Sequence, residues 1–158
     1  MKSPGNVVVF ALDSQRYALS LSQVERVVRT VEITPLPQAP DIVSGVINLQ
    51  GRIVPVFNIR KRFRLTEREI GLSDQMIVAN TSRRTISFWV EAVEGVMELP
   101  DHKIVPPEEI LPEMDYVEGV VKLDNGMVFI HDLERFLSLE EESALDNALK
   151  GKDGEEGR

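Results

Sequence analysis

The feature that most restricts how this chain can fold is an internal repeat. The segment 45–51, GVINLQG, is similar to the segment 119–126, GVVKLDNG. Each is followed by an apolar stretch, a polar residue and a phenylalanine, which are Asn58 and Phe63 in the first copy and Asp132 and Phe136 in the second. Two copies are too few for a solenoid, which needs at least about three repeats to bury a continuous core. The repeat therefore predicts two similar small units that pack together.

A second pair of similar segments lies upstream of the first pair. One match is between RYALSL at 16–21 and RTISF at 84–88. The other is between the segments that follow, VERV at 24–27 and VEAV at 90–93. The repeat therefore covers most of both halves. A coincidence between apolar strands is the less favoured interpretation, because turn residues match as well as apolar ones. A chain of 158 residues corresponds to about one ordinary domain. The two units are therefore expected to share their interior.

Composition and charge exclude several classes of protein. The net charge of −8 repels nucleic acid and anionic membrane surfaces at long range, which favours a protein partner. The chain contains no cysteine, so disulfides, thiolate zinc sites and cysteine nucleophiles are excluded. No apolar run approaches the roughly 20 residues of a membrane helix. We therefore expect a cytoplasmic protein that binds no nucleic acid and makes no direct contact with the membrane.

Strand patterns dominate the chain, in the segments 6–12, 16–21, 45–50, 53–57, 76–79, 85–90, 116–123 and 127–130. Turn residues separate several of these segments, as in β-hairpins, and short strands at this spacing predict a mainly β fold of small barrels. Asn58 is placed to cap a short helix. Ser138 and Glu141 have the spacing of a capping box, which predicts a helix over 138–150. The polar residues 151–158 are expected to form a flexible tail.

Residues that carry common enzyme chemistry are sparse. His102 and His131 stand beside Asp101 and Asp132, but neighbours on a strand point to opposite faces, so neither pair forms a dyad or a metal site without a bend. The sequence has no nucleophile elbow, phosphate loop or zinc-protease motif. We therefore expect no catalytic residue, no metal site and no cofactor. For Trp89 two interpretations stay open: an exposed binding residue, or a residue tucked between the two halves.

The repeated segments resemble the CheW family of bacterial chemotaxis coupling proteins. The resemblance rests on GVINLQGRIVPVFNIR at 45–60, YAL at 17–19, VERV at 24–27, VEAV at 90–93 and IHDLERFL at 130–137. It implies one CheW-like domain over residues 1–158, made of two intertwined five-stranded barrels of the Src homology 3 type. The first barrel is expected at roughly 15–73, and the second at roughly 74–137 with the strand 6–12 added. This agrees with the two units that the repeat predicts.

The resemblance also implies a function without catalysis. Members of the family couple methyl-accepting chemoreceptors to the histidine kinase CheA, whose regulatory domain is itself CheW-like. The chain is then expected to act as a cytoplasmic scaffold beside membrane-bound receptor arrays, with weak self-association as an additional contact. The helical tip of the receptor is expected in a groove between the barrels, lined by Val8, Leu21, Val24 and Val93. The positions that correspond to the family's kinase-binding surface are Val27, Val28, Gly45, Asn48, Gln50, Gly51 and Arg52.

One departure from the family pattern bears on the partners. Many members have Asn-Leu-Arg-Gly where this chain has NLQG at 48–51, so a positive charge linked to signalling is missing at Gln50, and Arg52 is a candidate to replace it in part. Three alternatives stay open. They are a CheW-like adaptor of a twitching or developmental pathway, a β-barrel that binds a small ligand and, more remotely, a hydrolase that uses Asp101, His102 and Glu108. An apolar groove between barrels favours an adaptor, whereas an enclosed polar pocket favours a ligand-binding protein.

Overall fold

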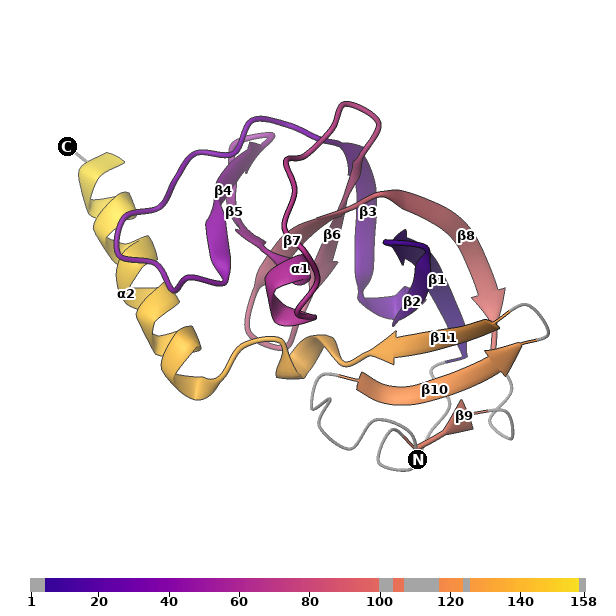
Figure 1. Ribbon diagram of the computed structural model, residues 1–158. Helices are drawn as coiled ribbons and strands as arrows, with labels where there is room; N and C mark the ends of the chain where they lie inside the picture. The colour runs from indigo at the N-terminus through magenta and orange to yellow at the C-terminus, as the bar shows by residue number, and fades with distance from the viewer. Residues whose placement is uncertain (1–4, 100–103, 107–116, 124–125, 157–158) are drawn as a thin grey trace.

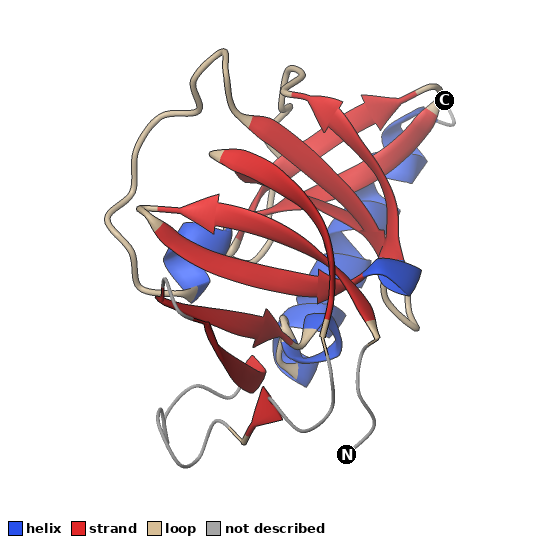
Figure 2. Cartoon of the chain, turned by 90° about the vertical axis from the view of Figure 1, so that its right-hand side faces the viewer, coloured by secondary structure: helices blue, strands red, loops and turns tan. Residues whose placement is uncertain are grey.

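Two curved β-sheets make up most of the structure, a computed structural model that describes residues 5–99, 104–106, 117–123 and 126–156 (Figure 1). One sheet has six strands in the order β8-β1-β2-β11-β10-β9, and the other has five in the order β3-β6-β7-β5-β4. We call them sheet A and sheet B. The view in Figure 2 shows how strongly the strands curve. The expectation of a mainly β fold is confirmed.

The strands of sheet A come from the two ends of the chain. They are β1 (Asn6–Leu12), β2 (Gln15–Ser20), β8 (Ala92–Glu98), β9 (Ile104–Val105), β10 (Val117–Leu123) and β11 (Gly126–His131). Those of sheet B come from the middle. They are β3 (Val24–Arg29), β4 (Val43–Leu49), β5 (Arg52–Phe57), β6 (Gln75–Asn80) and β7 (Thr85–Val90).

The internal repeat appears in the structure as two intertwined sets of strands. The first copy consists of β1 to β5, and its counterparts in the second copy are, in order, β6, β7, β8, β10 and β11. Replacing each strand by its counterpart converts the order β8-β1-β2-β11-β10 of sheet A into the order β3-β6-β7-β5-β4 of sheet B. The parallel pair of β5 with β7 corresponds to the parallel pair of β11 with β2. Each sheet therefore contains strands of both copies, and exchanging the copies exchanges the sheets, as an approximate two-fold relation requires.

The sheets divide the chain differently from the expected barrels at 15–73 and 74–137. β2 lies in sheet A beside β1, whereas β6 and β7 lie in sheet B beside β3 and β5. The reason is the intertwining: the chain passes from sheet A to sheet B after β2 and returns after β7. Sequence similarity shows that two copies exist, but it does not show which copy supplies the neighbour of a given strand.

The structure also corrects the alignment of the upstream segments. Val24 and Val27 lie opposite Ala79 and Ile77 of β6, and the corresponding positions opposite β1 are held by Val93 and Val96. The segment VERV at 24–27 therefore corresponds to VEGV at 93–96, and not to VEAV at 90–93. In both strands the register shifts at the glutamate, Glu25 or Glu94, as at a β-bulge.

Two corresponding glycines allow close approach of the chain in the two long hairpins. A Cβ atom on Gly45 would lie 2.3 Å from the backbone oxygen of Thr34, and one on Gly119 would lie 2.6 Å from Cγ2 of Ile104. Each glycine adjoins a register shift in its hairpin. The glycines that open the two repeated segments are thus required by packing rather than by a turn.

The helices are short except for the last. Asn58 caps α1 (Ile59–Arg62) by accepting a hydrogen bond from the Lys61 N–H, at 3.0 Å. The shorter 3-10 helices are η1 (Leu21–Gln23) and η4 (Leu133–Arg135). Both expected caps are confirmed, because in the Ser138 capping box Oγ of the serine accepts from the Glu141 N–H at 3.1 Å and the Glu141 carboxylate accepts from the Ser138 N–H at 2.9 Å.

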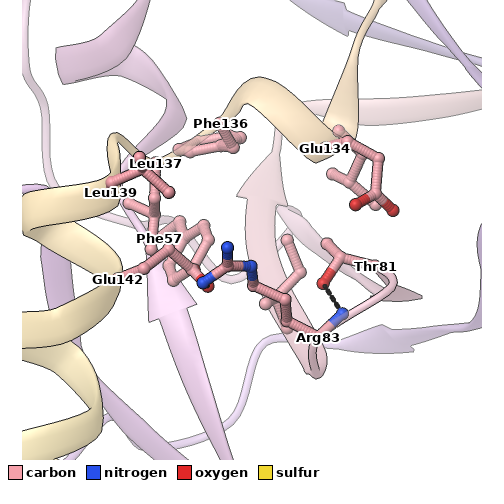
Figure 3. A pocket seen from close by; sticks show the side chains of 10 residues that line it. Phe57, Thr81, Arg83, Glu134, Phe136, Leu137, Leu139 and Glu142 are labelled. Carbon is pink, nitrogen blue, oxygen red and sulfur yellow. Dashed lines mark hydrogen bonds and ion pairs between the residues drawn. The ribbon is translucent and has the colours of Figure 1, made fainter.

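The C-terminal helix is longer than the sequence predicts. α2 spans Leu139–Glu156, whereas residues 151–158 were expected to form a tail. The glycines at 151 and 154 suggested an end, but glycine inside a helix costs only about 1 kcal/mol relative to alanine and does not by itself stop it. In Figure 1, α2 lies beside β4 and β5, away from β9 and β10. Near its start, Leu139 and Glu142 border a cavity of about 70 Å³ that is also lined by Phe57, Phe136 and Leu137 (Figure 3).

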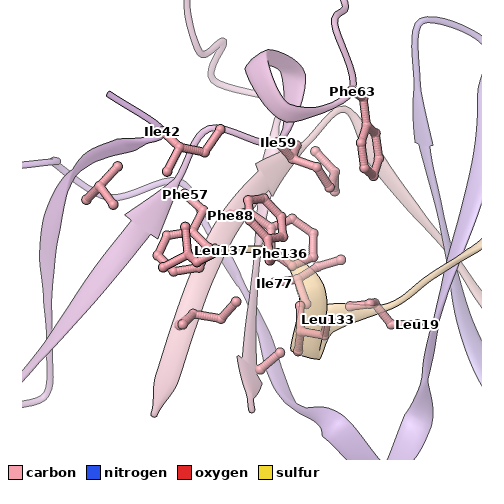
Figure 4. Close-up of a cluster of buried hydrophobic side chains, with 14 of the residues drawn as sticks. Leu19, Ile42, Phe57, Ile59, Phe63, Ile77, Phe88, Leu133, Phe136 and Leu137 are labelled. Atoms are coloured by element: carbon pink, nitrogen blue, oxygen red, sulfur yellow. The ribbon is translucent and has the colours of Figure 1, made fainter. Parts of the chain in front are cut away.

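Apolar side chains fill three separate cores. The largest lies between the sheets and includes Leu19, Phe57, Phe88 and Phe136 (Figure 4). Phe10 of β1 and Leu145 of α2 also belong to it. A second cluster includes Val9, Ala18, Val121, Val128 and Ile130 of sheet A, and a third includes Ile47, Val54, Met76, Val78 and Trp89 of sheet B. Each sheet therefore has its own core and also shares one with the other sheet, as two packed barrels require.

Candidate partner-binding surfaces

The residues of the expected receptor groove come from both sheets, and they differ in exposure. Val24 of β3 and Val93 of β8 are half-buried and pack against the core between the sheets. Leu21, in η1, is 37% exposed, whereas Val8 is only 4% exposed. Three of the four residues therefore reach solvent, and Val8 belongs to the layer beneath them.

The corrected alignment adds two residues that the sequence analysis did not assign to this surface. Val27 and Val96 occupy corresponding positions on β3 and β8, on the same faces as Val24 and Val93. Val27 is 37% exposed and Val96 is 61% exposed. We call the surface formed by Leu21, Val24, Val27, Val93 and Val96 the junction surface. The repeated pattern V-E-x-V was the sequence signal that could have identified Val96.

A polar contact ties the two sides of the junction surface together. The Val93 N–H donates to Oε1 of Gln75, at 2.8 Å, and Gln75 lies opposite Arg29 in the pairing of β6 with β3. The start of β8 is therefore held beside the end of β3. This contact positions the Val93 side chain relative to sheet B.

The expected kinase-binding residues divide between the β4–β5 turn and the interior. Gln50 and Gly51 form the turn with φ of 53° and 89°, and the Gly51 N–H donates to Oδ1 of Asn48 at 2.8 Å. These residues and Arg52 are exposed. Val28 packs against the core of sheet B, and Gly45 is buried at its close approach to Thr34. Both of these inner residues serve the fold.

An ion pair connects the β4–β5 turn to β3. The Arg52 guanidinium donates through Nη1 and Nη2 to the two carboxylate oxygens of Glu25, with Nη1–Oε1 at 3.2 Å. The hydrogen bonds from Arg52 lower the pKa of the Glu25 carboxyl. Glu25 therefore belongs to the turn surface, although the sequence analysis did not include it. Two cations therefore face Glu25, which are Arg52 and Arg26, whose Nε lies 3.5 Å from Oε2 of Glu25.

The comparison with known families decides the identity of the fold. The family model named CheW-like domain matches residues 6–141, which include the eleven strands of the described residues. The chain belongs to the CheW-like family.

Relatives of this CheW-like chain match over most of their length. The chain is 30% identical over 131 residues to the chemotaxis protein CheW of Thermotoga maritima, covering 83% of this chain and 86% of the relative. It is 28% identical over 145 residues to the chemotaxis protein CheW of Klebsiella aerogenes, covering 90% and 87%. The crystal structure of the scaffolding protein TtCheW from Thermoanaerobacter tengcongensis is similar with a TM-score of 0.79 and 31% identity, covering 87% of this chain and 95% of that chain.

A network around one buried arginine joins the two sheets of the CheW-like fold. Arg60 of α1 is 1% exposed and donates to the carboxylates of Asp13, in the β1–β2 turn, and Glu91, between β7 and β8. The guanidinium carbons of Arg60 and Arg68 lie 5.5 and 5.1 Å from the ring centroid of Trp89. Trp89 is 4% exposed, so the interpretation as an exposed binding residue is wrong. It lies in the core of sheet B.

The described residues of this CheW-like chain bring together no cluster of metal-binding side chains. Residues 5–99, 104–106, 117–123 and 126–156 contain no group of three or more histidine, aspartate or glutamate side chains placed to hold a metal ion. Asp101, His102 and Glu108 lie outside the described residues. His131 is buried among aromatic rings, with its ring centroid 5.1 Å from that of Phe63. In the part of the chain that the structure describes, no helix is long and apolar enough to cross a membrane.

Proposed function

We propose that this chain is a non-catalytic adaptor that couples methyl-accepting chemoreceptors to the histidine kinase CheA in bacterial chemotaxis. Membership of the CheW-like family supports the proposal, as does similarity to a protein described as a scaffold. We place the protein in the cytoplasm, beside membrane-bound receptor arrays. In the described residues, each sheet has a core of buried apolar side chains.

The junction surface is the observation that carries the proposal. It places exposed Leu21, Val27 and Val96 around the half-buried Val24 and Val93, at the edge strands of both sheets. Amphipathic helices bind through apolar residues three or four positions apart that insert into such apolar surfaces. We propose that the helical tip of a chemoreceptor docks here, with Val8 supporting the surface from beneath.

The kinase-binding surface is proposed at the β4–β5 turn. Asn48, Gln50, Gly51 and Arg52 are exposed there, and Glu25 is linked to them through Arg52. Val27 lies on β3 close to both surfaces, whereas Val28 and Gly45 support this region from inside. Because the CheA regulatory domain is itself CheW-like in this family, we propose that it meets the turn through one of its own barrels.

The receptor contact is tested by titration calorimetry with a soluble chemoreceptor-tip fragment. Val24→Glu and Val96→Glu place a charge on the junction surface, and we expect each to weaken tip binding by about tenfold or more. Val96 is largely exposed, so its variant separates a binding defect from misfolding. Leu139→Glu, at an exposed apolar residue of α2, is the matched control and is expected to bind normally. Equal binding by all four proteins would refute the placement.

The kinase contact is tested with the isolated CheA regulatory domain, the same proteins and the additional variant Arg52→Glu. We expect Arg52→Glu to weaken kinase binding because it places two carboxylates together, while receptor-tip binding is retained. Val96→Glu is expected to show the opposite pattern. A chain that binds neither the kinase domain nor the tip would contradict the adaptor function as a whole.

A further inference from the structure

On the face of β3 and β8 that contributes to the junction surface, the valines of the two strands correspond to each other, whereas the residues that end the strands differ in charge. Opposite residues of paired strands point to the same face. On β3, Val24, Val27 and Arg29 lie opposite Ala79, Ile77 and Gln75. On β8, Val93, Val96 and Glu98 lie opposite Phe10, Val8 and Asn6. The valines are thus repeated, whereas an arginine on one wall corresponds to a glutamate on the other.

The arginine and the glutamate lie at opposite ends of the junction surface. Arg29 ends β3 beside Gln75, whose side chain binds the backbone at Val93, where β8 begins. Val7 of β1 pairs with Ser20 of β2 on one side and with Met97 of β8 on the other. The end of β8, at Glu98, therefore lies just across β1 from the residues that lead into β3. β3 and β8 therefore run in opposite directions along the surface. One end carries the cation and the other end carries the anion.

Both side chains are available to a partner. Arg29 and Glu98 are exposed, and neither makes an ion pair or a side-chain hydrogen bond with another residue in the described part of the chain. Arg26 and Glu25, on the same strand as Arg29, are already paired with each other at 3.5 Å. The end charges are therefore set apart from the ion pairs that hold the fold.

We propose that Arg29 and Glu98 set the direction in which an amphipathic helix docks on the junction surface. The nearly symmetric valines alone would accept a helix in either direction with similar burial. The end charges remove this ambiguity: acidic side chains of the helix, or the negative end of its dipole, lie at Arg29, and basic side chains lie at Glu98. This inference rests on the proposed function, because it specifies the charge pattern of the receptor helix.

The length of the surface sets the length of the probe. The six residues of β3 extend about 17 Å at 3.3 Å per residue, which corresponds to about eleven residues of helix at 1.5 Å each.

Two alanine-rich peptides of about 20 residues, long enough to be helical, carry the same leucine stripe. One has lysines near its N-terminus and glutamates near its C-terminus, and the other has these charges exchanged. A nitroxide at the N-terminus of each peptide reports its direction by broadening nearby amide resonances.

In the wild-type protein, the first peptide is expected to broaden amides at the Glu98 end and the second at the Arg29 end. The double reversal Arg29→Glu with Glu98→Arg should exchange these two patterns. Each single reversal should weaken binding of the first peptide about threefold, as expected for exposed ion pairs, and the effect should fade at 0.5 M salt. The double variant Lys122→Glu with Glu140→Arg, at exposed positions outside the surface, keeps the net charge and should behave as wild type.

The outcomes separate this inference from the proposed function. If a chemoreceptor-tip fragment binds but the direction of the peptides does not respond to the double reversal, or if the peptides do not bind at all, the directional role is overturned and the adaptor function stands. If neither the fragment nor the peptides bind, both fail. If only the peptides bind, with the expected reversal, the directional role is supported and the receptor as natural partner is rejected.

Discussion

At the scale of single residues, Arg52 decides the electrostatics of the β4–β5 turn. The position where many family members carry arginine holds Gln50, yet Glu25 still has a guanidinium partner. We expect Arg52→Ala to raise the pKa of Glu25, because hydrogen bonds from Arg52 are the largest cause of its lowering. The measurement is an NMR titration of the Glu25 carboxyl. Arg26→Ala, which removes a weaker Coulombic influence on the same group, should raise this pKa less.

His131 is predicted to make stability depend on pH. Burial, with a smaller contribution from the Arg62 cation, lowers its pKa from 6.5 to about 3. Between these values the unfolded chain binds a proton at His131 that the folded chain does not, so the free energy of unfolding falls as the pH drops below 6.5 and the full stability is present above it.

His131→Leu removes this titration. Between pH 7 and pH 5, the wild-type protein should lose about 2 kcal/mol more stability than the variant, at about 1.4 kcal/mol per pH unit below 6.5. Urea unfolding of both proteins at the two pH values measures the difference. Equal losses would show that His131 is protonated in the folded state or that it does not titrate.

At the scale of elements, α2 is part of the fold. Leu145 is 0% exposed in the core between the sheets, whereas Leu139 on the same helix is 76% exposed. We expect Leu145→Ala to reduce the free energy of unfolding by about 2–4 kcal/mol, since it leaves a cavity in a packed core. Leu139→Ala should change it by less than about 0.5 kcal/mol. Chemical denaturation of the two variants provides the comparison, and similar values for both would show that α2 does not dock as described.

The junction surface is itself a property of two elements. β3 and β8 are edge strands of different sheets, and each presents two valines on the face toward the shared core. Neither strand alone forms an apolar surface wide enough for a helix. The surface exists because the Gln75 side chain and the packing of Val24 and Val93 hold the two edges together.

At the scale of the whole molecule, Arg60 links the sheets through charge. Its guanidinium reaches Asp13 beside sheet A, Glu91 at the crossing between the sheets, and the Thr66 carbonyl. We expect Arg60→Lys to lower the free energy of unfolding by about 2 kcal/mol, because a lysine ammonium cannot reproduce this planar set of hydrogen bonds and would sit as a strongly hydrated charge at a position that is 1% exposed. Arg83→Lys, at a side chain that is 54% exposed, is the control with a smaller expected loss. Thermal unfolding followed by Trp89 fluorescence measures both.

Local sequence patterns were sufficient for eight of the described strands and for the existence of two copies, but not for β3, β8 and β9. The caps at Asn58 and Ser138 were predictable because each depends on residues three positions apart, and the strands because apolar alternation is a local signal. The family resemblance rested on the same short segments. The end of α2 was not predictable in this way, because the glycines at 151 and 154 are compatible with both a helix and a tail.

Only the tertiary structure decided how the copies combine. Pairings between residues far apart in the chain decide which copy supplies the neighbour of a strand. They also decide the correspondence of Val24 with Val93 and the burial of Val8. The same holds for the partners of Arg52 and for the placement of Arg29 and Glu98 at opposite ends of one surface. A sequence specifies the side chains of each strand, but a strand's neighbours are selected by the free energy of packing the whole core, which no local pattern contains.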